Sequence, residues 1–480
     1  MNKFIFMLSV TGFGSLGAWV RGPFIPLSIY YAYGVLRPQF LWKWDLITYP
    51  DIGWSFYVAG SALASYIPWS LGVVGPRNDP ERRTLVPFGW THRFVMLFGV
   101  WICFSYGFAN NQDVAYPYFE EYLKIFVIYL LSTQVIRSFW QVRTIYMLVT
   151  CALGYIAIDI NQMYFESQYL LIYHRGYAGL DNNGAGLMLA MGVPLCYFAW
   201  EFLTKWYRWG FLLLMPLLIH GVVSSYSRGA MLSMGIVALS YIIFTKKKRF
   251  LCLLYLVIAL MMPFMAGKEI QDRFFSVEEA STDSSFGSRL DSWAAAVRIA
   301  NEFPVFGAGI RNSNLLSKQY GADLEGRTIH STYLQIAADN GWLGLIVYSL
   351  TLMTALGAIW RTRIRLWRNK DPESIRIVAM LGGIECSLWT FIIGGTALSL
   401  ETFELPYILT LLGAQIWMIC NARILPPPGV SLRAPPPNQI TVTNQRRPQL
   451  PPAAESPSES TNPPIPTRAT FSGPPGASGS

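Results

Sequence analysis

Long apolar runs separated by short polar connections fill most of the chain. Each run is close to the roughly 20 residues that an α-helix needs to cross a bilayer, which predicts an all-α polytopic membrane protein of about 12 or 13 spans. The first two runs, residues 4–20 and 23–36, form either two short spans or one span and a half-buried helix. The other expected spans cover residues 51–74, 92–109, 118–136, 143–162, 183–203, 208–224, 229–245, 249–267, 332–360, 375–396 and 403–421.

One long polar segment interrupts this pattern and divides the chain. Residues 1–267 are expected to form an N-terminal transmembrane bundle, 268–330 a loop with an amphipathic helix, and 331–423 the C-terminal transmembrane helices. Residues 424–480 hold half of the chain's 30 prolines and few large apolar residues. Such a segment is predicted to be a disordered tail, which is either a docking tail for another protein or dispensable.

Composition agrees with the membrane prediction, because only 14% of the 480 residues are charged, against about 25% in soluble domains. The net charge of +9 does not indicate nucleic-acid binding, since the basic residues cluster between apolar runs as the positive-inside rule describes. The six cysteines lie in apolar segments without pairing or metal-ligand spacing, so neither disulfides nor a zinc site is expected. The first apolar run lacks a cleavage-type site and is predicted to be a retained span.

The basic clusters predict the orientation. Residues 246–249 and the cluster from Arg361 to Lys370 should face the cytoplasm. Counting spans between them places the loops near 110–117, 163–182, 225–229, 268–330 and 397–402 on the outer side, and the C-terminal tail in the cytoplasm.

Four arginines, Arg175, Arg228, Arg289 and Arg311, lie on or beside these outer loops, against the usual bias. Arginine near a bilayer is costly unless it has a partner. Arg228 follows Ser225-Tyr226-Ser227 in a connection of only a few residues, where its guanidinium suits a bidentate phosphate contact. The alternative is an arginine that snorkels or contacts a lipid headgroup.

Arg289 is expected to open an amphipathic helix, in which Ser288 and Asp291 have capping-box spacing and Pro304 follows the end. Leu290, Trp293 and Val297 repeat at helical intervals and should form the packed face. Arg289 is then either a binding residue or a structural one. Arg311 follows Gly307-Ala308-Gly309, where a loop role competes with substrate binding.

Arg175 belongs to a Gly/Asn-rich turn that enters an apolar span. This arginine and the helix N-terminus, with Asn182, would face an anionic headgroup. In the alternative, Asn182 and Asn183 merely cap the helix.

His330 stands where the long loop re-enters the membrane, and an imidazole of near-neutral pKa there can act as a general base. A purely structural histidine is the alternative. His220 is expected to be a satisfied core residue, His92 to lie at a cytoplasmic end, and His174 is a reserve candidate. The chain has no Gly-rich phosphate loop, Gly-x-Ser-x-Gly elbow or His-Glu-x-x-His motif, so neither metal-dependent nor serine-hydrolase chemistry is supported, and no cofactor is expected.

Three groups of residues resemble motifs of the O-antigen ligase/Wzy polymerase superfamily. His330-Ser331 followed by Gly341 and Gly344 resembles its signature, Ser227-Arg228-Gly229-Ala230 its Ser-Arg-Gly element, and Arg289 with the 304–309 segment its large periplasmic loop. The 181–183 and 225–228 segments, with Arg21-Gly22-Pro23-Phe24 and Arg37-Pro38, look closest to the exosortase-associated O-glycosylation ligase subgroup. The resemblance covers about residues 1–422.

The resemblance implies a GT-C-like helical bundle in a bacterial inner membrane with a periplasmic active site. The implied reaction is metal-independent transfer of an undecaprenyl-diphosphate-linked glycan to a glycan, lipid or protein acceptor. Arg228 and Arg289 carry over as a diphosphate clamp and His330 as the base, with Arg175, Arg311 and Asn182 as substrate-binding candidates. The alternatives are a transporter or flippase of lipid-linked glycan and, among enzymes, a protein O-oligosaccharyltransferase.

Overall fold

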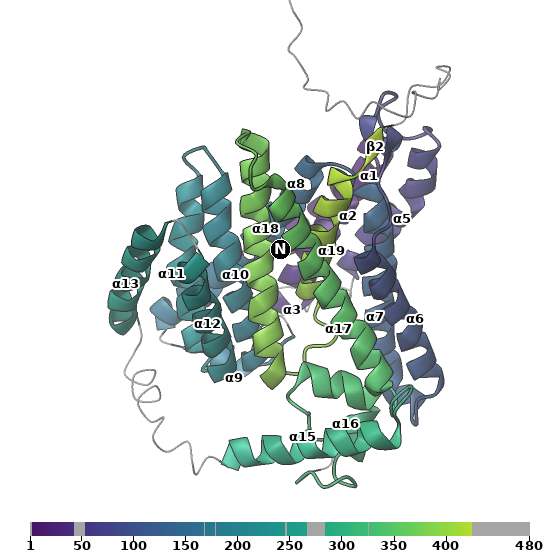
Figure 1. Ribbon diagram of the computed structural model, residues 1–480, viewed down its shortest axis with the longest axis vertical. Coiled ribbons are helices and arrows are strands. Elements are labelled where there is room, and N and C mark those ends of the chain that lie inside the picture. The colour runs from purple at the N-terminus through teal and green to yellow at the C-terminus, as the bar shows by residue number, and fades with distance from the viewer. Residues whose placement is uncertain are drawn as a thin grey trace, which may run out of the picture. The chain divides into compact units, whose positions relative to one another are not determined.

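The computed structural model describes residues 2–42, 53–167, 169–177, 179–244, 247–265, 284–324 and 326–424. They form a mostly helical membrane protein (Figure 1). The expected Pro-rich tail, the docking role considered for it, and residues 268–283 of the expected loop lie outside the described residues.

Every apolar run predicted as a span overlaps a helix. Five described helices, α1, α8, α10, α17 and α18, are long and apolar enough to cross a membrane. The larger helices are α1 (Asn2–Arg21), α2 (Phe24–Leu36), α5 (Trp54–Ser70), α6 (Trp90–Gly107), α7 (Gln112–Val135), α8 (Phe139–Ser167), α10 (Asn182–Phe202), α11 (Arg208–Ser224), α12 (Arg228–Phe244), α13 (Lys248–Met265), α15 (Ser284–Glu302), α17 (Thr332–Leu366), α18 (Pro372–Gly394) and α19 (Glu404–Cys420). The short elements are α3 (Pro38–Leu41), α9 (Leu171–Arg175), α16 (Asn312–Leu316), the 3₁₀ turns η1 (Pro80–Arg83) and η3 (Gly395–Ala397), and the paired strands β1 (Thr84–Leu85) and β2 (Arg423–Ile424).

The helix α19 lies at the centre of the bundle. It packs against α2, α6, α7, α8, α17 and α18, and most of its side chains are buried. A second group forms around α10, which packs against α8, α11, α12 and α18 (Figure 1). These contacts bring helix ends from both halves of the sequence together, and the site lies among those ends.

The helix α17 is broken at Gly341, which has φ 76° and ψ 169° (Figure 1). A Cβ there would lie 2.1 Å from the carbonyl oxygen of Val305, so only glycine fits this backbone. The indole N–H of Trp101 donates to the carbonyl of Asn340 (2.9 Å) and the Ser105 hydroxyl to that of Asp339 (2.9 Å). The break therefore leaves these two carbonyls satisfied by side chains of α6.

The 304–309 segment packs against the same break in α17. The N–H groups of Ala308 and Gly309 donate to the carbonyls of Ala338 and Asp339 (2.9 and 3.0 Å). The 304–309 segment and the break at Gly341 are thus hydrogen-bonded to each other, which sets the direction of the first turns of α17.

Two predictions for the helix α15 are wrong, namely its first residue and part of its packed face. It begins at Ser284, not at Arg289, and the Ser288 hydroxyl accepts a hydrogen bond from the Arg327 side chain instead of capping a helix. Leu290 is 46% exposed. The packed face is formed by Trp293, Ala296 and Ile299, because the small alanine lets α15 approach α17 closely.

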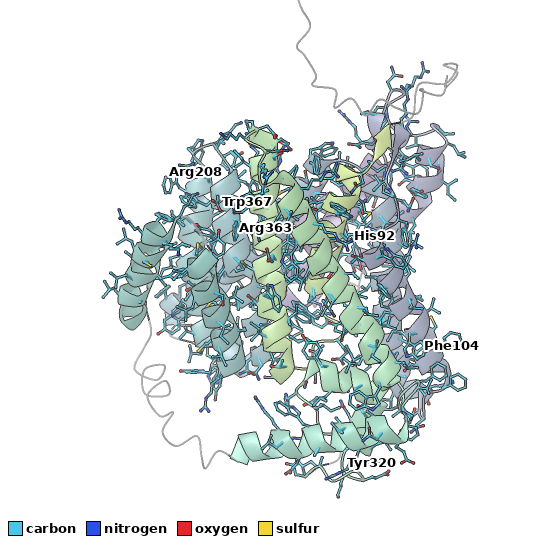
Figure 2. All side chains as sticks on the ribbon, in the orientation of Figure 1. His92, Phe104, Arg208, Tyr320, Arg363 and Trp367 are labelled. Carbon is cyan, nitrogen blue, oxygen red and sulfur yellow. The ribbon has the colours of Figure 1, made fainter. Side chains whose placement is uncertain are left out.

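The two ends of the bundle carry different residues. Figure 2 shows Arg208, Arg363 and His92 toward one end, and Phe104 and Tyr320 toward the other. Arg208, Arg363 and His92, which the sequence predicts on the cytoplasmic side, therefore lie toward the same end of the bundle.

Candidate functional site

A cavity of about 430 Å³ opens among helix ends and loops of the bundle. This volume is in the range of small-ligand sites. It is lined by polar and apolar residues from the end of α2, the start of α7, the connection before α10, the segment before α17 and the α18–α19 loop: Arg37, Tyr118, Glu121, Gly179, Leu180, Asp181, Arg311, Thr328, His330, Leu398, Ser399, Leu400, Thr402 and Phe403.

His330 reaches this cavity from the residue before the N-cap of α17. Its backbone is left-handed, with φ 54°. Ser331 is the N-cap of α17 and accepts a hydrogen bond from the N–H of Leu334 (3.4 Å). The His330 Nε2 lies 3.1 Å from the Thr328 hydroxyl, which fixes the ring against the cavity wall.

The surroundings of His330 favour a neutral imidazole. Burial lowers the pKa of His330, and the positive charges of Arg289 and Arg327 lower it further, while the Asp181 carboxylate acts in the opposite direction. The net pKa lies below the ordinary value of histidine. A neutral ring at neutral pH can accept a proton.

Arg311 is anchored by a buried carboxylate and an aromatic ring. Its Nε lies 2.8 Å from Oε1 of Glu401, and its guanidinium lies 5.0 Å from the ring centre of Tyr118. Burial lowers the pKa of Arg311, but the carboxylates of Glu401 and Asp339 outweigh burial and raise it above its usual value. Arg311 therefore stays a cation.

Glu401 is held in place by the start of α17. The Thr332 hydroxyl donates to the carbonyl of Leu398 (2.6 Å) and accepts from the N–H of Leu400 (3.1 Å). The Tyr407 hydroxyl donates to the Glu401 carbonyl (3.0 Å). The residues after His330 thus position the loop that supplies the partner of Arg311.

Arg37 enters the cavity from the end of α2. Its Nη2 lies 4.0 Å from Oε1 of Glu121 on α7. On the opposite wall, Asp181 caps α10 by accepting the N–H of Gly184 (2.8 Å). Asp181, and not the asparagines considered for this role, is therefore the cap of α10.

The other predicted site residues lie outside the cavity lining. Arg289 is half-buried on α15 and acts on the pKa of His330. Asn182 donates from its amide to the carbonyl of Ser225 (3.0 Å), which ties the α10 start to the turn before α12. Arg228 is exposed at the first position of α12, and Arg175 is exposed at the end of α9.

The remaining histidines lie elsewhere. His220 is buried, with Nδ1 2.7 Å from the Asn161 side-chain oxygen, and is the satisfied core residue that the sequence predicted. His92 of α6 is buried, with Nδ1 3.0 Å from the hydroxyl of Tyr129 on α7. His174 is exposed on α9 and stacks on Tyr169, so it does not line the cavity.

Sequence reasoning missed Glu401, Glu121, Tyr118 and Arg37 as site residues. The sequence indicates Arg37 only through its place in the subgroup motif Arg37-Pro38. For Glu401 one signal was available, because a lone acid in the short predicted outer loop 397–402 can pair with an outer arginine. Nothing in the sequence spacing joins Glu121 or Tyr118 to His330.

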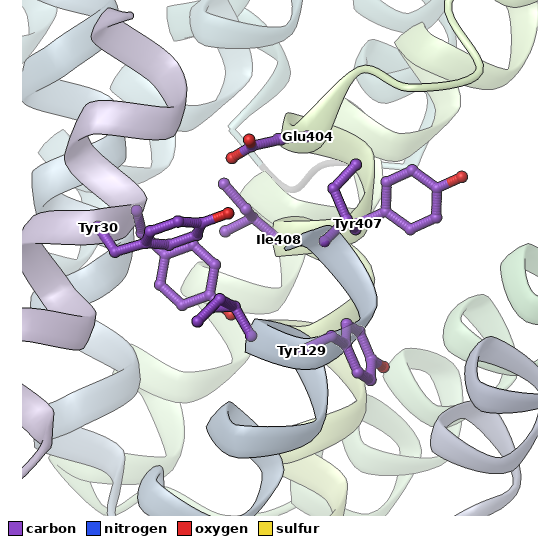
Figure 3. A pocket seen from close by; sticks show the side chains of 8 residues that line it. Tyr30, Tyr129, Glu404, Tyr407 and Ile408 are labelled. Atoms are coloured by element: carbon purple, nitrogen blue, oxygen red, sulfur yellow. The ribbon is translucent and has the colours of Figure 1, made fainter. Parts of the chain in front are cut away.

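A much smaller cavity of about 10 Å³ lies between α2, α7 and α19 (Figure 3). Tyrosines and Glu404 line it, and Figure 3 shows Glu404 above Ile408 between Tyr30 and Tyr407. This volume is close to the minimum for one water, so it is too small for a sugar or a phosphate. Among the described residues, no group of three His, Cys, Asp or Glu side chains has the arrangement of a metal site.

Residues 213–349 match the family model described as O-antigen ligase. The matched segment runs from α11 into α17 and contains Arg228, Arg289, Arg311 and His330. This match supports the O-antigen ligase/Wzy superfamily, which the motif resemblance predicted, over this part of the chain. No curated protein matches the chain. The match supports glycan transfer of the O-antigen ligase/polymerase type, with a lipid-linked glycan and an acceptor as substrates, and it fits the multi-pass membrane fold.

Proposed function

We propose that the cavity transfers a glycan from an undecaprenyl-diphosphate carrier to an acceptor hydroxyl, without a metal, at the periplasmic face of a bacterial inner membrane. The bundle is then of the GT-C-like kind with about 12 spans. The observation that carries the proposal is that His330, Arg311 and Arg37 line one cavity.

The chemistry requires a proton acceptor and fixed positive charge. The acceptor oxygen attacks the anomeric carbon while the bond to the diphosphate oxygen breaks, and its electron pair leaves with the diphosphate. The neutral imidazole of His330 takes the proton of the acceptor hydroxyl. Arginines stabilise the charge that develops on the leaving diphosphate.

Arg228 and Arg289 are proposed as further diphosphate contacts, from their match to the family motifs. Arg289 already acts on His330 through its charge. Arg228 begins α12 at the turn that Asn182 holds in place, so Asn182 is proposed to position this turn. Arg175, which is exposed, is proposed to contact the carrier at the bilayer surface.

The site assignment is tested by His330→Ala and Arg228→Ala in a transfer assay with membrane-extracted protein. Both variants should lose transfer, by about 10² or more for the loss of a general base, while the protein still accumulates in the membrane. Wild-type transfer in both would contradict the assignment.

The members of this class of glycan-transferring enzymes differ in the acceptor that receives the glycan. We propose a ligase or polymerase of an exported polysaccharide, of the exosortase-associated subgroup. A deletion strain distinguishes them: loss of long chains indicates a polymerase, and long but unattached chains indicate a ligase. Unchanged polysaccharide with lost protein glycosylation would indicate a protein O-oligosaccharyltransferase.

A transporter or flippase of the same lipid-linked glycan is the second candidate. Transporters are often built from repeats that converge near the middle of the membrane. The sequence shows no repeat between its halves, and the polar cavity is built from helix ends and loops. Both features favour the enzyme.

A further inference from the structure

Left-handed backbone marks the basic residues of the cavity. Among the residues that the structure describes, four non-glycine residues have positive φ: Arg37 (45°), Tyr226 (54°), Arg311 (58°) and His330 (54°). Three of these line the same cavity, and all three carry basic side chains. Such backbone is uncommon outside glycine and concentrates at sites where the surrounding structure imposes it for function.

Arg37 occupies a position that glycine usually takes. It is the C-cap of α2, and its N–H donates to the carbonyl of Tyr33 (2.7 Å). A glycine would close the helix there with less strain. The presence of arginine and not glycine at this position is therefore explained by a role of its side chain.

The side chain of Arg37 lies against the cavity wall. Its guanidinium lies 5.4 Å from the ring centre of Phe40, and Nη1 lies 3.4 Å from where a Cβ on Gly179 would be. Its ion partner Glu121 is 43% exposed and 4.0 Å away. An exposed ion pair of this length is weak, so an anion of higher charge can replace Glu121.

Arg311 differs, because its partner Glu401 is only 1% exposed. The Nε of Arg311 lies 2.8 Å from an oxygen of this carboxylate. A buried pair holds the guanidinium in one direction, whereas the longer, exposed pair of Arg37 can open. The cavity thus has one fixed and one exchangeable arginine on its lining.

We propose that Arg37 binds the diphosphate of the lipid-linked substrate together with Arg311, and that Glu121 holds Arg37 when no substrate is bound. This inference rests on the proposed function. Arg37 lies outside the matched residues 213–349, so the N-terminal helices supply part of the substrate site and not only membrane packing.

The test uses the purified full chain in detergent, with farnesyl diphosphate as the probe and farnesol as the matched probe without diphosphate. Arg37→Gln should weaken farnesyl diphosphate binding about tenfold or more, the effect of losing charge-assisted hydrogen bonds. Farnesol binding should not change. Arg376→Gln on α18, an arginine 36% exposed and paired with Glu373, is the control and should bind as wild type.

Glu121→Gln separates substrate binding from a structural role. It removes the competing carboxylate, so farnesyl diphosphate should bind about two- to fivefold more tightly, in proportion to a weak exposed ion pair. Arg37→Gln binding within twofold of wild type, or Glu121→Gln binding that is unchanged or weaker, overturns the inference. If Arg37→Gln does not fold, the Glu121→Gln result decides alone.

Transfer from a lipid-diphosphate glycan is measured with the same wild-type preparation. Suppose that the wild-type protein transfers glycan, and that both variants bind farnesyl diphosphate as the wild type does. That result contradicts only the role of Arg37 and leaves the proposed function in place. If the wild-type protein consumes no lipid-linked glycan, the result contradicts the proposed function itself.

Discussion

The Nε of Arg311 lies 2.8 Å from Oε1 of Glu401, and this carboxylate is almost fully buried. The pair joins the matched segment to the α18–α19 loop, which follows it by some 50 residues of chain outside the family match. A buried carboxylate whose partner lines the cavity is best understood as the group that orients that partner.

Glu401→Gln should therefore impair both stability and transfer. The change removes the nearest counter-charge of the mostly buried Arg311 guanidinium, which costs about 3 kcal/mol in comparable buried pairs. We expect a lower Tm and a reduced kcat/KM, with the loss larger than for Glu373→Gln, whose arginine partner is exposed. Equal Tm and kcat/KM for Glu401→Gln and the wild type would show that Glu401 does not orient the Arg311 side chain for transfer.

The pH profile of transfer should follow the charges around His330. A general base must be neutral, so the rate falls at acid pH as His330 becomes protonated, and this fall should occur below the ordinary pKa of histidine. Removing a positive charge raises the pKa of His330, so Arg289→Gln should move the acid limb to higher pH. Removing the Asp181 charge does the reverse, so Asp181→Asn should move it to lower pH.

The measurement is kcat/KM against pH for the three proteins. Because Asp181 also caps α10, the position of the limb and not the absolute rate is compared. Shifts in the same direction for both variants would mean that a group other than His330 controls the limb.

The glycines of α17 give a matched pair of stability predictions. Gly341→Ala would place a Cβ 2.1 Å from the Val305 carbonyl oxygen at φ 76°, so it should destabilise the protein by about 3 kcal/mol or more and displace His330. Gly357→Ala in the same helix meets no atom within 4 Å and should be neutral or stabilise by about 0.5–1 kcal/mol. Thermal unfolding in detergent tests both, and equal Tm values would show that the break is not required.

The fold could be predicted from the sequence to a large extent, because bilayer-length apolar runs specify helices by composition alone. Each predicted run overlaps a helix, and His330 and Arg311, both named from the sequence, line one cavity. The contact of Arg311 with Tyr118 and the position of Arg37 and Glu121 on the same cavity wall could not be predicted. These contacts depend on how α2, α7 and α19 pack side by side, and the similar apolar faces of membrane helices contain little information on their neighbours.

The start of α15 shows a different limit. Ser288 and Asp291 have the spacing of a capping box, yet the helix begins four residues earlier at Ser284. A capping box is a local preference, and a tertiary contact can override it. Here the Ser288 hydroxyl accepts a hydrogen bond from the side chain of Arg327, which lies in the segment before His330.

The central claim is that the cavity around His330 transfers a glycan and does not merely move its carrier. The most direct measurement uses purified protein in liposomes that contain a radiolabelled lipid-diphosphate glycan and an acceptor. Wild-type protein should attach the label to the acceptor and release the carrier diphosphate in equal amounts, and His330→Ala should do neither. Intact labelled lipid that only changes leaflet, equally with wild type and His330→Ala, would contradict the account.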